Sequence, residues 1–188
     1  MCGRFTLMTD KEYADLERIV REVENDKGVQ LSRGGDIYPT NASPVLINRQ
    51  GRRLADLFQW GFPNFYNKGV IINARAETVP EKKTFRSCLD ERRCVVPAAG
   101  FYEWDRQKQK ILFFQPHHAL YMAGLYQYYN DQPRYVVITT SANTSVSDIH
   151  DRMPLILQTD QIDPWLEDTG AAMSLLHIVP PALERLAV

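Results

Sequence analysis

The second residue of the chain is a cysteine, Cys2, which follows Met1 in the stretch MCGRF. If Met1 is removed, the chain begins with an amine and a thiol on adjacent carbons, with ordinary pKa values of about 8 and 8.5. Such a pair reacts with an aldehyde, because the amine forms an imine and the thiolate then closes a thiazolidine ring. If Met1 stays, Cys2 is an ordinary side chain near a loose terminus. The first interpretation predicts an aldehyde-reactive nucleophile.

Two further stretches, NARAET (73–78) and GFYEW (100–104), place polar groups beside apolar residues. Asn73 and Arg75 point to the same side if the strand that precedes them continues, and the alternative is an edge strand facing water. Glu103 lies between a tyrosine and a tryptophan, which predicts partial desolvation and a raised pKa. A carboxyl of this kind suits general acid–base work near neutrality. Alternatively, Glu103 pairs with an arginine.

A fourth stretch, DIHDRMP (148–154), contains His150, the only histidine with a charged residue within two positions on each side. An imidazole titrates near neutrality and can therefore move protons, although a single histidine is also a common structural residue. Arg152 follows two positions later and is suited to binding an anion or a carboxylate. The four stretches together hold the candidate catalytic groups.

Several other chemistries lack their motifs. The chain has no G-x-S-x-G elbow, no P-loop and no dinucleotide-binding glycine pattern. Its three cysteines, Cys2, Cys88 and Cys94, have no C-x-x-C spacing, which favours reduced thiols over disulfides or a zinc site. The sequence therefore predicts neither a metal nor a cofactor.

The elements that must position these groups are mainly short strands. Residues 9–24 predict a helix, in which Thr9 and Glu12 form a capping-box pattern. Shorter helices are predicted at 80–89, with Pro80 at the start, and at 163–170, with Asp163 as cap and Gly170 as stop. The predicted strands are two around a turn at 48–51, then 70–73, 94–98, 111–114, 120–126, 135–140, 154–157 and 174–179.

This pattern predicts an α+β fold with a mostly antiparallel, curled sheet or barrel-like core and a few peripheral helices. The 188 residues fit one domain, residues 1–188. No stretch has the length of a membrane span or the pattern of a signal peptide, so we expect a cytoplasmic protein.

The charge is unevenly distributed along the chain. The net charge is only −1, but residues 33–152 sum to +5, between acidic segments at 1–32 and 153–188. A basic surplus of this kind forms either a solvated face or a surface for nucleic acid. Charge alone does not decide between the two.

Taken together, MCGRF, NARAET, GFYEW and DIHDRMP resemble the SRAP family (SOS response-associated peptidase), proteins that sense abasic sites in single-stranded DNA. The resemblance implies a curled α+β domain and a processed N-terminus. Cys2 would form a covalent thiazolidine crosslink with the ring-opened abasic site. Asn73 would orient the terminal amine, Glu103 would handle protons during imine formation, and His150 would assist ring opening and reversal of the link.

The resemblance also implies DNA-binding residues. Arg4, Arg75 and Arg152 look like the family's phosphate binders, with Thr139 at a similar strand end. Trp60 resembles an aromatic that stacks on a base, and the alternative is a core tryptophan. The expected partner is single-stranded DNA that contains abasic sites. We expect the protein to be a monomer and to have no membrane partner.

Other interpretations remain open. Removal of Met1 is either autocatalytic, as a cysteine autopeptidase, or the work of an aminopeptidase, and the imine can also lead to strand nicking as an AP lyase. A different class is an N-terminal-nucleophile amidohydrolase, such as a glutamine amidotransferase domain, whose chains also start MCG. The chain has no Asn-Gly pair, which such domains usually use for an oxyanion hole. A third class is a non-covalent module for single-stranded DNA, in which Cys2 is incidental.

Overall fold

The structure is a computed structural model and describes residues 2–7, 13–31, 35–65 and 68–188. The strands are β1 (Phe5–Thr6), β2 (Asp36–Ile37), β3 (Ala42–Arg49), β4 (Arg52–Trp60), β5 (Phe62–Pro63), β6 (Val70–Ile71), β7 (Asn73–Arg75), β8 (Arg93–Ala98), β9 (Gly100–Trp104), β10 (Lys110–Phe114), β11 (Leu120–Tyr129), β12 (Gln132–Ser141), β13 (Arg152–Pro154), β14 (Ile156–Leu157) and β15 (Glu184–Ala187). The helices are α1 (Ala14–Lys27), α2 (Lys83–Glu91), α3 (Ile162–Glu167) and α4 (Thr169–Leu175), with a 3₁₀ turn η2 (Thr159–Gln161).

Five strands form a closed ring. β12 pairs with β4, followed by β3, β8 and β11, and β11 pairs again with β12. The ring is antiparallel except for the short contact between β12 and β4, and β7 also joins β12 in parallel. Inward residues of this barrel, such as Val45, Ile47 and Val137, are fully buried. The predicted α+β class with a curled, mostly antiparallel core is confirmed.

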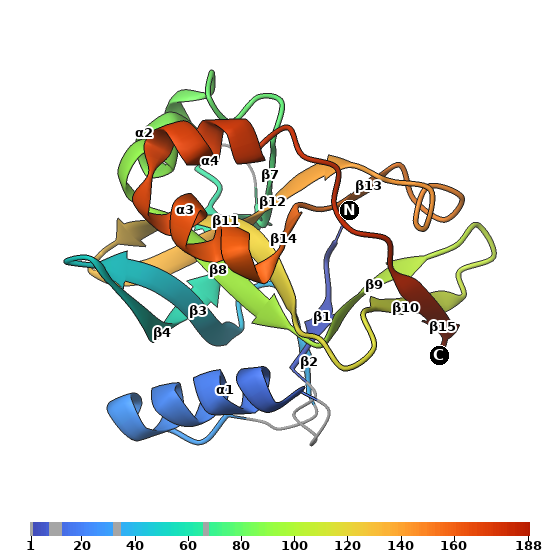
Figure 1. Cartoon of the computed structure of the whole chain (residues 1–188), viewed down its shortest axis with the longest axis horizontal. Helices are drawn as coiled ribbons and strands as arrows, with labels where there is room; N and C mark the ends of the chain where they lie inside the picture. The colour runs from blue at the N-terminus through green and yellow to red at the C-terminus, as the bar shows by residue number, and fades with distance from the viewer. Residues whose placement is uncertain (1, 8–12, 32–34, 66–67) are drawn as a thin grey trace.

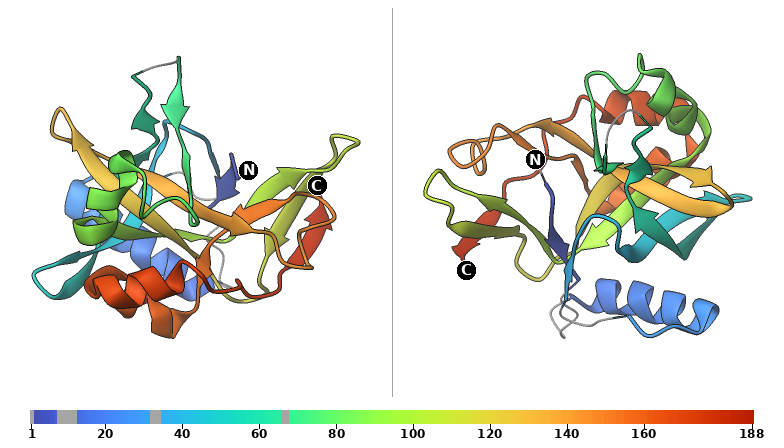
Figure 2. Two further views of the ribbon diagram at one scale, coloured as in Figure 1. Left: turned by 90° about the horizontal axis from the view of Figure 1, so that it is seen from above. Right: turned by 180° about the vertical axis from the view of Figure 1, so that it is seen from behind.

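A second sheet lies beside the barrel, in the order β15, β10, β9, β1, β2. Its neighbouring strands are all antiparallel. β1 is only two residues long, yet it is the strand between β9 and β2. Residues 2–6 are therefore placed inside the molecule, between the barrel and the β9–β10 hairpin (Figures 1 and 2).

The helices cover the barrel from two sides. Figure 1 shows α1 on one side and α2, α3 and α4 on the other. α1 buries Leu16, Ile19, Val20 and Val23, the face that its three- and four-residue spacing predicts. It ends at Gly28, whose φ of 63° is left-handed. The described helix starts at Ala14, and the predicted capping pair Thr9 and Glu12 lies outside the described residues.

The C-terminal part of the chain differs from its prediction. Residues 174–179 form the end of α4 and a turn, not a strand. Gly170 does not stop a helix, because Asp168 accepts a hydrogen bond from the Ala171 N–H at 2.7 Å and starts α4 there. The apolar spacing of this segment fits either periodicity, and the cap decides in favour of a helix. None of the described helices has the length and apolar character that crossing a membrane requires.

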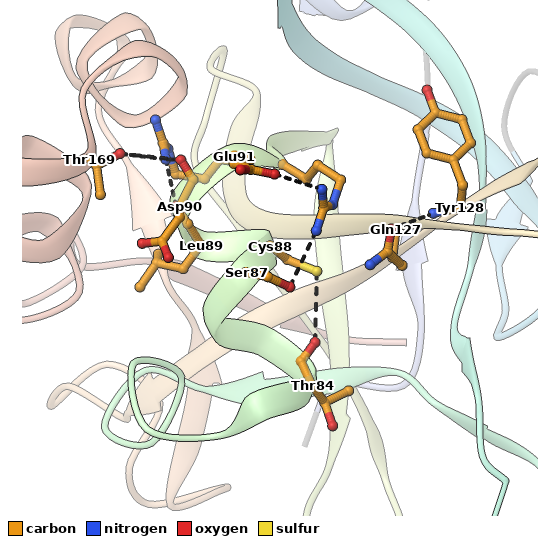
Figure 3. A network of polar contacts seen from close by, with 11 residues as sticks. Thr84, Ser87, Cys88, Leu89, Asp90, Glu91, Gln127, Tyr128 and Thr169 are labelled. Atoms are coloured by element: carbon orange, nitrogen blue, oxygen red, sulfur yellow. Dashed lines mark hydrogen bonds and ion pairs between the residues drawn. The ribbon is translucent and has the colours of Figure 1, made fainter.

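Arg93 holds the ends of two helices against the barrel. It starts β8, is 6% exposed, and donates to the carbonyl oxygens of Leu89 and Asp90 at the end of α2 and of Trp165 and Leu166 in α3. The last carbonyls of a helix have no partner within the helix, so a buried guanidinium is a suitable cap. Figure 3 shows Leu89 and Asp90 at this end of α2, beside Thr169 of α4.

Candidate active site

Cys2 lies just before β1, in the interior of the molecule. Its side chain has no exposed surface. The segment that carries it is tied to GFYEW, since Tyr102 N–H donates to Arg4 O at 2.9 Å and Ala99 N–H donates to Thr6 O at 2.8 Å. β1 therefore brings the first stretch of the sequence to the third one.

The Cys2 thiol is neutral in this environment. Burial raises its pKa far above the ordinary value, and the negative charge of Glu103 raises it further. Its Sγ donates a weak hydrogen bond to Arg4 O at 3.8 Å. A thiol with the ordinary pKa of about 8.5 is partly ionised near cellular pH, but the surroundings of Cys2 shift its pKa upward, away from that range. The thiol needs a base before it can attack.

Asn73 contacts the backbone of Cys2. Its Nδ2 donates to the Cys2 carbonyl oxygen at 3.0 Å, across 71 positions of sequence. Its Oδ1 is buried and has no hydrogen-bond partner among the described residues. The predicted strand at 70–73 is divided, because β6 ends at Ile71 and a separate strand, β7, runs from Asn73 to Arg75 and pairs with β12. Asn73 thus fixes the position of Cys2 from the barrel side.

Glu103 is buried in β9, with 4% of its surface exposed. Burial raises the pKa of its carboxyl, as its aromatic neighbours predicted, and the positive charge of protonated His150 lowers it. Both Cys2 and His150 are therefore close enough to interact electrostatically with Glu103. A buried carboxyl with a raised pKa is suited to general acid–base catalysis.

His150 precedes β13 and is partly buried. Its Nδ1 lies 2.9 Å from the backbone N–H of Arg152, a group that can only donate. The neutral ring therefore accepts at Nδ1 and carries its proton on Nε2. Asp151 Oδ1 and Arg152 O lie 3.0 and 3.2 Å from the same nitrogen and would accept from the imidazolium.

The predicted DNA-binding arginines have different surroundings. Arg75 is exposed, and no ion pair or hydrogen bond of its side chain is found within the described residues. Arg152 is instead paired with Glu77, through contacts of 2.5 and 2.8 Å, and also donates to Thr139 O at 2.6 Å. Thr139 is fully buried. Of the two partners that the sequence allowed for Arg152, an anion or a carboxylate, the structure has a carboxylate.

Trp60 is in the core. It has no exposed surface, packs on Phe5 with ring centroids 5.2 Å apart, and donates from Nε1 to Ile72 O at 3.0 Å. Neither face of the Trp60 ring is accessible to a base, so its burial fits the interpretation of Trp60 as a core residue. Because it packs on Phe5, Trp60 helps to hold β1 in place.

The sequence missed an aromatic pair at the surface. The Arg4 guanidinium lies 4.4 Å from the centroid of the Tyr38 ring and 5.0 Å from that of Trp104. Tyr38 and Trp104 are 42% and 37% exposed. Trp104 directly follows Glu103, which is the one sequence signal that could have identified it. Rings and a cation thus stand side by side next to the candidate site.

No metal site is evident in the described ranges, where no three His, Cys, Asp or Glu side chains are grouped to hold an ion. Cys2, Cys88 and Cys94 are free and buried. The candidate chemistry therefore rests on the side chains described above.

The comparisons with known proteins agree with one another. Residues 1–188 match the family described as SOS response associated peptidase (SRAP). The chain is 35% identical over 187 residues to the abasic site processing protein YoqW of Bacillus subtilis, covering 88% of this chain and 80% of that protein. It is 26% identical over 178 residues to the abasic site processing protein YedK of Escherichia coli, covering 88% and 79%. It is 28% identical over 242 residues to the abasic site processing protein HMCES of Rattus norvegicus, covering 94% and 68%.

Two solved structures have the same fold. A protein from Bacteroides thetaiotaomicron superposes with a TM-score of 0.79 at 22% identity, covering 100% of this chain and 92% of that one. A phage-related protein from Bordetella bronchiseptica gives 0.78 at 22% identity, covering 100% and 94%. The family match spans every residue of the chain, and the relatives carry one and the same functional name. The chain is a member of the SRAP family.

Proposed function

We propose that this protein processes abasic sites in single-stranded DNA by forming a thiazolidine crosslink through Cys2 after removal of Met1. The observation that carries the proposal is the setting of Cys2, whose carbonyl is held by Asn73 at 3.0 Å and whose thiol is influenced by Glu103. The names of the relatives support the substrate class.

The reaction starts at the amine, because the neutral thiol is a weak nucleophile. The free amine of Cys2 attacks the aldehyde carbon of the ring-opened sugar and forms a carbinolamine. The carboxyl of Glu103 donates a proton to the departing hydroxyl, so that water leaves and the imine forms. The Asn73 Oδ1, which has no other partner among the described residues, accepts from the amine and aims it.

The second step closes the ring. Loss of water leaves the imine nitrogen protonated. The Glu103 carboxylate takes the proton of the Cys2 thiol, and the sulfur adds to the carbon of this protonated imine, whose nitrogen keeps its proton. One water is lost overall, and the product is a thiazolidine. His150, with its proton on Nε2, assists opening of the sugar and reversal of the link. Elimination of the 3′ phosphate from the imine is the lyase path, and ring closure competes with it.

DNA is held by charge and stacking. Arg4 and Arg75 bind phosphates, which gives affinity without sequence preference. Tyr38 and Trp104, which flank Arg4, offer exposed rings for a base and take the stacking role that the sequence suggested for Trp60. Arg152 is largely buried and Thr139 is fully buried, so these two residues support the site from inside the protein.

The amidohydrolase alternative is less consistent with this site. It requires a thiolate as the first nucleophile, whereas burial and the Glu103 charge both raise the pKa of the thiol. The crosslinking reaction needs the thiolate only after the imine has formed. The non-covalent alternative is addressed directly by experiment.

Intact mass spectrometry tests the proposal. The protein is incubated with a short oligonucleotide carrying one abasic site, and with the undamaged oligonucleotide as control. We expect a mass equal to protein without Met1 plus damaged oligonucleotide minus one water, mapped to Cys2. Cys2→Ser should give only a labile adduct that borohydride traps. A heat-stable adduct formed by Cys2→Ala would contradict the proposal.

A further inference from the structure

Glu77 forms the most complete ion pair near the candidate site. Its two carboxylate oxygens accept from Nη1 and Nη2 of Arg152, at 2.5 and 2.8 Å, in a bidentate arrangement. The Arg152 side chain is only 11% exposed, whereas that of Glu77 is 47% exposed. The Arg152 side chain is therefore largely buried, and both terminal nitrogens of its guanidinium already donate to the Glu77 carboxylate.

The Arg152 side chain is also held from the inside of the protein. Thr139 O in β12 accepts from Arg152 Nη2 at 2.6 Å and from the Ala76 N–H at 2.9 Å. One carbonyl thus joins the segment after β7 to the beginning of β13. We refer to Glu77, Arg152 and Thr139 as the brace.

The brace connects the two sides of the candidate site. β7 begins with Asn73, which contacts Cys2, and Arg152 presents its backbone N–H to His150 Nδ1 at 2.9 Å. We infer that Glu77 is a positioning residue for the proposed crosslinking reaction: by holding Arg152 it holds His150 in the form that carries its proton on Nε2. The inference rests on the proposed function, and it assigns Arg152 to the brace instead of to a phosphate.

The length of β13 explains why the brace is needed. β13 has three residues, and Arg152 pairs with Ser141 at the very end of β12. Asp151 Oδ1 and Arg152 O lie close to His150 Nδ1 and would draw a proton onto it. If Glu77 no longer fixes Arg152, residues 150–152 can shift, and the proton is then shared between the two ring nitrogens.

Competition with DNA is the contrasting role for the same carboxylate. In that case Glu77 would merely occupy the Arg152 fork until a phosphate displaced it, and its removal would strengthen binding. The anchoring of Arg152 on Thr139 O and its burial favour the positioning role. Only the competing role predicts tighter binding of DNA when the Glu77 carboxylate is removed.

The test compares Glu77→Gln with the wild type. Asp163→Asn is the matched control, because it also converts a carboxylate of an arginine pair into an amide, 3.0 Å from Arg53 and away from the site. Two-bond ¹H–¹⁵N spectra at pH 8 report the tautomer of each of the four histidines. Single-turnover crosslinking at saturating abasic DNA gives the rate, and titration with undamaged DNA gives the affinity.

We expect the wild type and Asp163→Asn to show His150 protonated on Nε2, and Glu77→Gln to show a mixture. The saturating rate of Glu77→Gln should fall by roughly tenfold, less than the factor of 10² or more for loss of an acid–base group itself. Glu77→Asp should recover part of the rate. An unchanged tautomer and rate, or tighter and more salt-dependent binding at an unchanged rate, would overturn the inference. The tautomer is measured without DNA, so failure of the wild type to crosslink would refute the proposed function separately.

Discussion

Glu103 and Phe101 are two residues apart in β9, which places them on the same side of the strand, and both side chains are buried. Burial destabilises the ionised form of the Glu103 carboxyl, and its pKa is raised as a result. Between the ordinary pKa and this raised one, the folded state binds more protons than the unfolded state. The stability that comes from the neutral carboxyl is therefore present at low pH and is lost as the pH rises through the raised pKa.

Glu103→Gln should thus separate activity from stability. We expect the variant to crosslink abasic DNA at least about 100-fold more slowly, because the proton carrier is gone. It should be more stable than the wild type at pH 8 and no more stable at pH 4. Urea denaturation at the two pH values measures this difference. A variant that is less stable than the wild type at pH 8 would show that ionised Glu103 is well compensated.

Some residue-scale features could be predicted from the sequence and others could not. The raised pKa of Glu103 follows from its immediate neighbours, which are visible in GFYEW. The pairing of Glu77 with Arg152 joins residues 75 positions apart, and the burial of Trp60 depends on strands that meet only in the fold. Local sequence defines what a side chain can do, whereas exposure and partners depend on long-range packing.

At the scale of elements, β9 positions Glu103 through its first residue. A Cβ on Gly100 would lie 2.6 Å from Phe113 O and 2.8 Å from Leu112 Cδ1, both in β10. Only a glycine allows β9 and β10 to approach this closely. The register of Glu103 toward Cys2 depends on that approach.

Gly100→Ala should therefore impair both fold and site. We expect a loss of about 1–3 kcal/mol in unfolding free energy, since β9 must move away from β10, and slower crosslinking at temperatures where the variant is folded. Gly170→Ala is the control, because a Cβ there meets only Asp168 Oδ1 at 3.2 Å, near the start of α4. Its effect should stay within about 1 kcal/mol. Equal effects of the two variants would contradict this account.

Arg93 gives a prediction on stability alone. Arg93→Met removes the donors for four helix-end carbonyls and should cost about 3 kcal/mol in urea denaturation. Arg92→Met is the matched control, since that side chain pairs with the exposed Glu91 at 2.9 Å, and it should cost less than about 1 kcal/mol. Below its melting transition, Arg93→Met should crosslink normally. A crosslinking defect in the folded variant would mean that these helices influence the site.

The strands were easier to predict than the ends of the helices. The hairpin of β3 and β4 follows from two apolar runs around the turn at 48–51, and α1 follows from its apolar face. Residues 174–179 were assigned to a strand because a short apolar run fits both a strand and a helix. β15 was missed, since all four of its residues are exposed and only its pairing with β10 makes it a strand.

At the scale of the whole molecule, the near-zero net charge hides the distribution that binding to DNA requires. The basic surplus lies within residues 33–152, which include β7 and β9, the strands that flank Cys2. Many of the arginines and lysines in this segment are paired with nearby carboxylates, as Arg152 is with Glu77. The sequence could show the surplus but not which cations are unpaired.

Salt dependence measures how many cations bind DNA. Arg75→Gln should lower the slope of log affinity against log salt by about 0.7 for a single strand, the value expected for one phosphate contact. Arg53→Gln, which removes a cation paired with Asp163, is the control and should leave the slope unchanged. Binding of an undamaged oligonucleotide at several salt concentrations gives both slopes. An equal change in the two variants would exclude a specific phosphate contact by Arg75.

The central place of β1 in its sheet also has a consequence for the time course of synthesis. Phe5 pairs with Phe101 and Ile37, and Asn73 holds Cys2, so every partner that buries the first residues is made later than they are. At about 5–20 residues per second, the ribosome needs roughly 5–20 s to reach β9. During that interval the beginning of the chain is open to an aminopeptidase. Once β9 docks, Cys2 and β1 are enclosed. In the proposed function, removal of Met1 by an aminopeptidase would therefore have to precede this step, whereas autocatalytic removal would follow it.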